Sequence, residues 1–167
     1  METLENKPTT GKALVEAEGF DIGVFDTKTA CNDGAEFELK HPVTGAKTGV
    51  FWSVLGTDSD VFQSIVKDRS DEDSRKAAMA ARSGEELPTR TADQIEARNV
   101  ELLAAVSTGW RTVIGKGDEA KSEPVLIFKG ERLSFTVPNV TRVLREMAQI
   151  RKQVDKAVGD LSLFIKA

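Results

Sequence analysis

Few residues in this chain have the type and setting for chemistry. His41 is the only imidazole, and it precedes Pro42 in an expected turn, where no serine, cysteine or carboxylate is tied to it by a known catalytic spacing. Cys31 is the only thiol. It lies in an apparent loop, and the sequence shows no histidine or helix start that would stabilise a thiolate. We therefore interpret His41 as a surface turn residue and Cys31 as an incidental thiol.

Two acidic clusters, at 58–60 and 71–73, are candidates for cation binding or proton transfer, because paired carboxylates do both. The spacing of a calcium-binding loop is absent, so we interpret the first cluster as a helix cap and the second as a solvated helix face. The segment 115–118, GKGD, lacks the spacing of a phosphate-binding loop and follows an expected helix. The sequence thus predicts no catalytic residue, no metal site and no cofactor, and we expect a protein that is not an enzyme.

The composition makes several classes of protein poor candidates for this chain. The 167 residues suit one domain, with 40% hydrophobic and 30% charged residues and a formal net charge of −4. An acidic chain is a poor candidate for nucleic-acid binding, which draws most of its affinity from a basic surface. No stretch approaches the roughly 20 apolar residues of a membrane span, and the first residues lack the apolar core of a signal peptide. We therefore expect a protein that contacts neither nucleic acid nor membrane. The single cysteine allows no internal disulfide, which favours the reducing cytoplasm.

The sequence patterns along the chain predict both strands and helices, and together they predict an α+β fold. Residues 1–12 are polar and read as a flexible N-terminal arm, and residues 13–167 as a single α+β domain. The segment 20–25, FDIGVF, is either a short strand or an anchor. Residues 36–40 alternate polar and apolar, and residues 48–55 are β-branched and aromatic, so a hairpin is predicted over about 35–56.

Helices are predicted over about 58–82, 91–114 and 138–165. Asp58 or Ser59 is expected to cap the first helix and Gly84 to end it. Trp110 falls on the apolar stripe of the second helix. A small second hairpin is expected over 125–135, before a long amphipathic C-terminal helix that bends near Gly159.

The C-terminal helix has two open interpretations. Its apolar positions follow nearly heptad spacing, and residues 138–167 carry six basic and three acidic side chains. Such a stripe packs either on the chain's own core or on a partner helix. The same choice applies to Trp110, since tryptophan serves both as a core residue and as an interface anchor. The candidate partner-binding residues are Trp110, Leu144, Met147, Val154, Leu161 and Phe164.

Short motifs in a fixed order resemble the tail assembly chaperones of long-tailed phages. Residues 35–69 are similar to the family's N-terminal hairpin and the turn that follows it, through Leu39, Pro42, Thr44, Gly45, Gly56, Asp58, Ser59 and Phe62. Further motifs resemble the family's second half: Trp110, the run from Lys129-Gly130-Glu131 through Phe135-Thr136 to Asn139, the segment 151–154 (RKQV), and Phe164. The resemblance covers about residues 25–164. The ending at 162–167 and the charged insert at 70–86 depart from the usual pattern.

This resemblance implies a non-enzymatic assembly factor of a phage or prophage. Such a protein binds the tape measure protein, keeps it soluble and helps to recruit the tail tube protein in the bacterial host cytoplasm, and it is generally absent from the finished virion. Self-association is a further expectation. The alternative function is a structural virion protein, such as a tail-completion or connector subunit.

Overall fold

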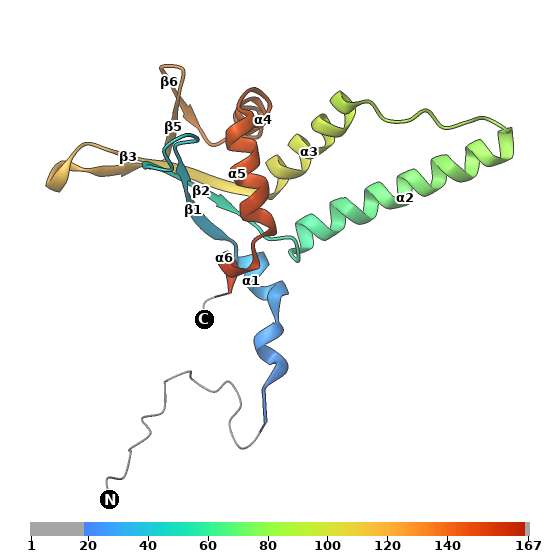
Figure 1. Ribbon diagram of the computed structural model, residues 1–167, viewed down its shortest axis with the longest axis horizontal. Coiled ribbons are helices and arrows are strands. Elements are labelled where there is room, and N and C mark those ends of the chain that lie inside the picture. The colour runs from blue at the N-terminus through green and yellow to red at the C-terminus, as the bar shows by residue number, and fades with distance from the viewer. Residues whose placement is uncertain (1–18, 166–167) are drawn as a thin grey trace, which may run out of the picture.

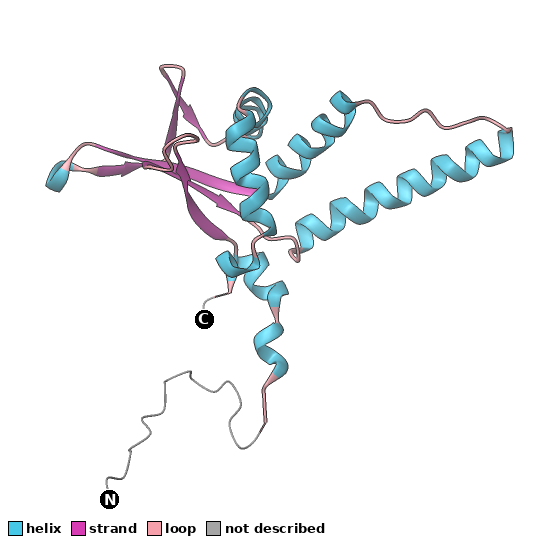
Figure 2. Cartoon of the chain, in the orientation of Figure 1, coloured by secondary structure: helices cyan, strands magenta, loops and turns pink. Residues whose placement is uncertain are grey.

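The computed structural model describes residues 19–165, so the expected arm at 1–12 lies outside the described residues. The predicted α+β class is confirmed: a four-stranded sheet, a separate two-stranded hairpin and several helices make up the fold (Figures 1 and 2). In chain order the elements are η1 Ile22–Phe25, α1 Thr27–Asp33, β1 Ala35–Lys40, β2 Lys47–Val54, α2 Asp60–Ser83, α3 Ala92–Val106, β3 Ser107–Ile114, η2 Gly117–Glu119, β4 Lys121–Glu123, β5 Val125–Phe128, β6 Glu131–Ser134, α4 Val137–Glu146, α5 Ala148–Gly159 and α6 Leu161–Phe164.

The main sheet is antiparallel, with the strand order β1-β2-β3-β4. The predicted first hairpin is confirmed as β1 and β2. Its turn is closed by a hydrogen bond from the Gly45 amide to the His41 carbonyl of 2.9 Å, and Gly45 has a φ of 69°, which glycine adopts without strain. The predicted second hairpin is confirmed as β5 and β6.

The predicted helix over 91–114 is wrong in its second half. The Thr91 hydroxyl caps α3 by accepting the Gln94 amide, but the helix ends at Val106, and the chain passes directly into β3. There Trp110 pairs with Trp52 of β2 in the antiparallel register. The β-branched and aromatic residues of 107–114 complete the sheet, so tertiary pairing overrides a spacing that also fits a helix.

The predicted single helix over 138–165 is also wrong, because the chain forms three shorter helices. Met147 separates α4 from α5, because its φ of −112° and ψ of 84° are not helical. The expected bend near Gly159 is confirmed, since α5 ends at this residue and α6 begins two residues later. Breaking the helix lets each short piece turn its apolar residues toward the same core.

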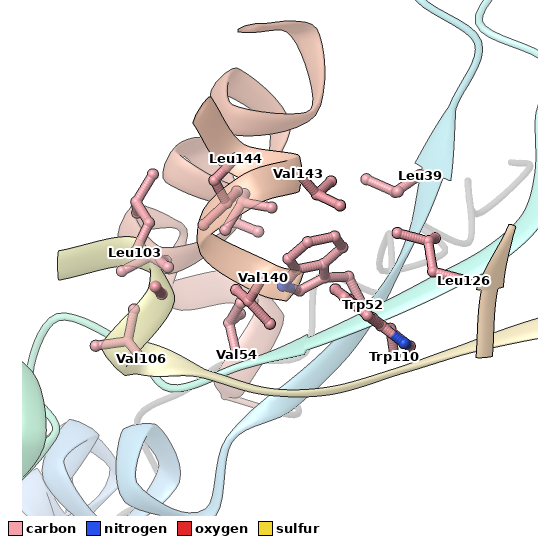
Figure 3. Packing of buried hydrophobic residues seen from close by; sticks show 14 of the residues in the cluster. Leu39, Trp52, Val54, Leu103, Val106, Trp110, Leu126, Val140, Val143 and Leu144 are labelled. Atoms are coloured by element: carbon pink, nitrogen blue, oxygen red, sulfur yellow. The ribbon is translucent and has the colours of Figure 1, made fainter. Parts of the chain in front are cut away.

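The core lies between one face of the main sheet and helices α3, α4 and α5. Trp52 and Val54 point from β2 toward this core, where they meet Leu103, Val143 and Leu144 (Figure 3). Trp52 also donates a hydrogen bond from Nε1 to the Ser107 hydroxyl oxygen at 2.9 Å, which satisfies its polar atom inside the core. The other face of the sheet carries no helix within the described part of the fold (Figure 2).

Helix α2 extends away from this core as a long arm and returns through a loop to α3 (Figure 1). Its predicted N-cap and C-terminal stop are confirmed. The Ser59 hydroxyl accepts the Phe62 amide, and Gly84 adopts the left-handed conformation that ends the helix. None of the 24 residues of α2 is buried.

No helix in residues 19–165 is both long enough and apolar enough to cross a membrane.

Candidate functional site

The single histidine has a structural role in its turn. The Nδ1 atom of His41 accepts the backbone N–H groups of Val43 and Thr44, at 3.3 Å each, as the turn leaves β1. Across residues 19–165 the structure gathers no group of three or more histidine, cysteine, aspartate or glutamate side chains that could hold a metal ion.

The expectation that Cys31 lies in a loop is wrong. Cys31 belongs to α1 and is fully buried, because α1 packs against the start of α2 and against α6. Gly56 lies so close that a Cβ atom added to it would be 2.3 Å from the Cys31 sulfur and 3.1 Å from the Phe164 ring. The thiol therefore fills space at the junction of three segments.

The two acidic clusters are used in helix capping and ion pairs. Asp60 accepts a hydrogen bond from the Asn32 side chain at 3.1 Å and pairs with Lys28 at 2.9 Å. The hydrogen bond from Lys28 lowers the pKa of the Asp60 carboxyl below its ordinary value. In the second cluster Asp73 pairs with Arg90 and lies 3.6 Å from Arg98. Both clusters thus attach neighbouring elements to α2.

Four of the six candidate partner-binding residues lie in the core of the described chain. Leu144 and Val154 are fully buried, and Trp110 and Phe164 are almost so. The ring centroids of Trp110 and Trp52 lie 5.2 Å apart. The Nε1 atom of Trp110 donates a hydrogen bond to the Leu133 carbonyl at 3.1 Å. Of the two interpretations left open by the sequence, core packing applies to these four side chains.

The other two candidates are accessible. Met147 is half-buried at the break between α4 and α5, and Leu161 is 39% exposed at the start of α6. These two residues lie 14 positions apart, at opposite ends of α5. A partner-binding surface must therefore be sought in other elements.

One such surface is the segment 20–25, which we call the apolar segment. Four large apolar side chains within it are exposed: Phe20, Ile22, Val24 and Phe25. The sequence marked this stretch as a strand or an anchor, and the structure makes its second part the short 3₁₀ helix η1. Exposed apolar clusters of this kind mark interaction sites more often than isolated exposed residues do.

A second surface is the arm formed by α2, the loop 84–91 and the start of α3. The arm is held by polar contacts: Arg69 donates to the Arg98 carbonyl at 2.9 Å and lies 3.4 Å from the Glu101 carboxylate. A groove of about 620 Å³ separates α2 from the loop and is lined in part by Leu87. Met79 on α2 is 70% exposed. The charged sequence of 67–76 gave no sign that apolar positions of this helix would remain uncovered.

Comparisons of the chain with protein-family models, with curated proteins and with solved structures found no match.

Proposed function

We propose that this chain is a tail assembly chaperone of a long-tailed phage or prophage. In this proposal it binds the tape measure protein in the cytoplasm of the bacterial host, keeps it soluble and helps to recruit the tail tube protein. It acts by binding alone and leaves the particle before the virion is complete.

The observation that carries the proposal is the exposed helical arm. Helix α2 has 24 residues and spans about 36 Å at a rise of 1.5 Å per residue, and none of its side chains is buried. A helix that packs so little on its own domain has its surface free for another chain. A tape measure protein is a long helical chain, and a partner helix can dock along such an arm.

The chemistry of the arm suits a helical partner. The groove beside α2 combines an apolar residue, Leu87, with charged side chains at its rim, Lys76 and Arg98 among them. Apolar contacts along this groove would stabilise a docked amphipathic helix, while the charged rim would select its orientation. The motif resemblance favours the tape measure protein as the source of that helix.

Co-expression with the tape measure and tail tube proteins of the same genome tests the proposal. The wild-type chain is expected to co-elute with the tape measure protein in size-exclusion chromatography. Met79→Glu combined with Leu87→Glu places two charges on exposed apolar positions of the arm, so it should abolish co-elution while circular dichroism stays unchanged.

The matched control is Ile127→Glu, which changes an exposed apolar residue on β5, away from the arm. It should co-elute like the wild type. A wild-type chain that ignores both partners and forms closed rings alone would contradict the proposal and favour a structural subunit of the tail.

A further inference from the structure

The loop 84–91, which we call the strap, joins the end of α2 to the start of α3 at the tip of the arm (Figure 1). Every residue of the strap is exposed. Its two ends are sharply defined, because Gly84 ends α2 in the left-handed conformation and Thr91 begins α3 through a capping box with Gln94. The strap can therefore move without unwinding either helix.

One ion pair holds the strap against the side of α2. The Arg90 guanidinium donates to the Asp73 carboxylate, and within residues 19–165 no other side-chain hydrogen bond or ion pair joins the strap to α2. The same carboxylate lies 3.6 Å from the guanidinium of Arg98 on α3. Asp73 thus connects α2 both to the strap and to α3. We call the pair of Arg90 with Asp73 the latch.

The latch is accessible to water and to dissolved ions. The side chains of Arg90 and Asp73 are 42% and 38% exposed. An exposed ion pair contributes little to stability, and salt screens charges beyond about 10 Å at 0.1 M and beyond about 3 Å at 1 M. The base of α2 is held differently, since Ser59 is buried and Phe62 packs against the core. Breaking the latch should therefore release the strap and leave the base of α2 in place.

The groove beneath the strap is small for the occupant that the proposed function requires. Residues of α2, α3 and the strap bound it on three sides, and its volume is about 620 Å³. A helix with its side chains has a diameter of roughly 10 Å, so about 8 Å of helix, less than two turns, fills this volume. The 24 residues of α2 span about 36 Å. A partner helix can use the length of the groove only when the strap moves aside.

We propose that the strap is a gate, which opens when the latch breaks and closes when it forms again. In the closed state Leu87 and Pro88 line the groove from the strap, opposite Ala97 of α3. Release of Arg90 lets the strap leave α2 and opens the groove at the tip of the arm, with the residues next to the two helix caps as hinges. Opening is a property of the free chain, whereas its use in admitting a partner helix rests on the proposed function.

Trypsin digestion tests the latch on the full chain, because trypsin must bind the side chain of the arginine or lysine after which it cleaves. The bond between Arg90 and Thr91 lies in the exposed strap, so the contact of Arg90 with Asp73 should limit its cleavage. Lys116 serves as the standard in the same digest. It is exposed and forms no ion pair in the described part of the chain.

Mass spectrometry gives the ratio of cleavage after Arg90 to cleavage after Lys116. This ratio should rise about two- to fivefold between 0.1 M and 1 M sodium chloride, as the latch is screened. Asp73→Asn removes the carboxylate, so it should raise the ratio at 0.1 M by a similar factor and make the ratio independent of salt, while circular dichroism stays unchanged.

The matched control is Glu101→Gln, which removes another exposed acid of the arm, one that lies 3.4 Å from Arg69 and does not touch the strap. It should be cleaved, and should respond to salt, like the wild type. A wild-type ratio that does not change with salt overturns the proposal, and so does an Asp73→Asn variant that is cleaved like the wild type.

Locking the strap tests whether the gate admits a partner. Asp73→Cys with Arg90→Cys places a thiol on each side of the latch, and a bismaleimide linker with a reducible bond would join them, since the native Cys31 is fully buried. The locked chain should not co-elute with the tape measure protein, and reduction of the linker should restore co-elution.

The outcomes separate the gate from the proposed function. A locked chain that co-elutes overturns the gate, and so does a reduced chain that fails to co-elute although the wild type does. If the wild type does not bind the tape measure protein, but its cleavage after Arg90 responds to salt and to Asp73→Asn as expected, the latch stands and only the proposed function fails.

Discussion

Gly56→Ala is expected to loosen the docking of α1, because Gly56 lies where three segments meet. The added Cβ would be 2.3 Å from the Cys31 sulfur, 2.9 Å from the Cys31 Cβ and 3.1 Å from a carbon of the Phe164 ring. The φ of Gly56 lies outside the left-handed region, so alanine fits the backbone and only the space is lacking. Helix α1 must shift, and with it the apolar segment that it carries.

The magnitude follows from overpacking. Forcing an extra methyl group into a filled core costs about 1–3 kcal/mol, and the 2.3 Å contact places this site toward the upper end. Cys31→Ala alone removes one buried heavy atom and should cost about 0.5–1.5 kcal/mol, as Ile→Val does. Cys31→Ala makes room for the methyl group that Gly56→Ala adds. The double variant should therefore lose about 1 kcal/mol less in free energy of unfolding than the two single variants lose together.

Urea unfolding followed by tryptophan fluorescence measures these differences, since Trp52 and Trp110 are both buried and their emission should shift when the core opens. Gly109→Ala is the matched control, because a Cβ added to this strand glycine meets no atom within 4 Å. If Gly56→Ala and Gly109→Ala unfold at the same urea concentration, or if the two changes at the junction add without coupling, the packing argument is refuted.

Three further predictions concern the sheet and its edge. The hydrogen bonds from Arg111 lower the pKa of Glu36, so the pair stabilises the fold at neutral pH, and this stability is lost as the pH falls below about 4.5 toward the lowered pKa. Glu36→Gln should therefore reduce stability at pH 7 and have little effect near pH 2, and an equal effect at both would refute the pairing. Trp110→Phe removes an N–H donor inside the core and should cost about 1–3 kcal/mol in thermal unfolding, whereas an unchanged melting temperature would contradict its placement. Gln153→Ala removes two hydrogen bonds to Lys40 worth roughly 0.5–1.5 kcal/mol each, so hydrogen exchange at the end of β1 should accelerate, and unaltered exchange there would show that the side chain does not seal the edge.

Local signals in the sequence predicted most of the elements. Ser59 begins α2 and Gly84 ends it, as predicted, because capping depends on a few adjacent residues. The hairpins were recognisable for the same reason, since their turns and alternation lie within a short stretch. These features required no knowledge of distant contacts.

The errors arose where distant contacts decide. Residues 107–114 fit a helical spacing, but the pairing of Trp110 with Trp52, 58 positions earlier, makes them a strand. The apolar stripe of the C-terminal segment could equally have faced a partner, and its burial of Leu144 and Val154 follows from how α4 and α5 fold onto the sheet. The sequence marked residues 20–25 as a strand or an anchor and predicted the helix of the arm, but it could not show which of their apolar residues remain uncovered. That exposure is visible only in the fold.

The solubility of the tape measure protein tests the proposed function most directly. The tape measure protein would be expressed in bacteria alone, with the wild-type chain, and with the Met79→Glu, Leu87→Glu variant, and its soluble fraction measured after lysis. If the chain is a tail assembly chaperone, the tape measure protein should aggregate alone, become soluble with the wild type and aggregate again with the variant. A soluble fraction that is the same in all three cultures would contradict it.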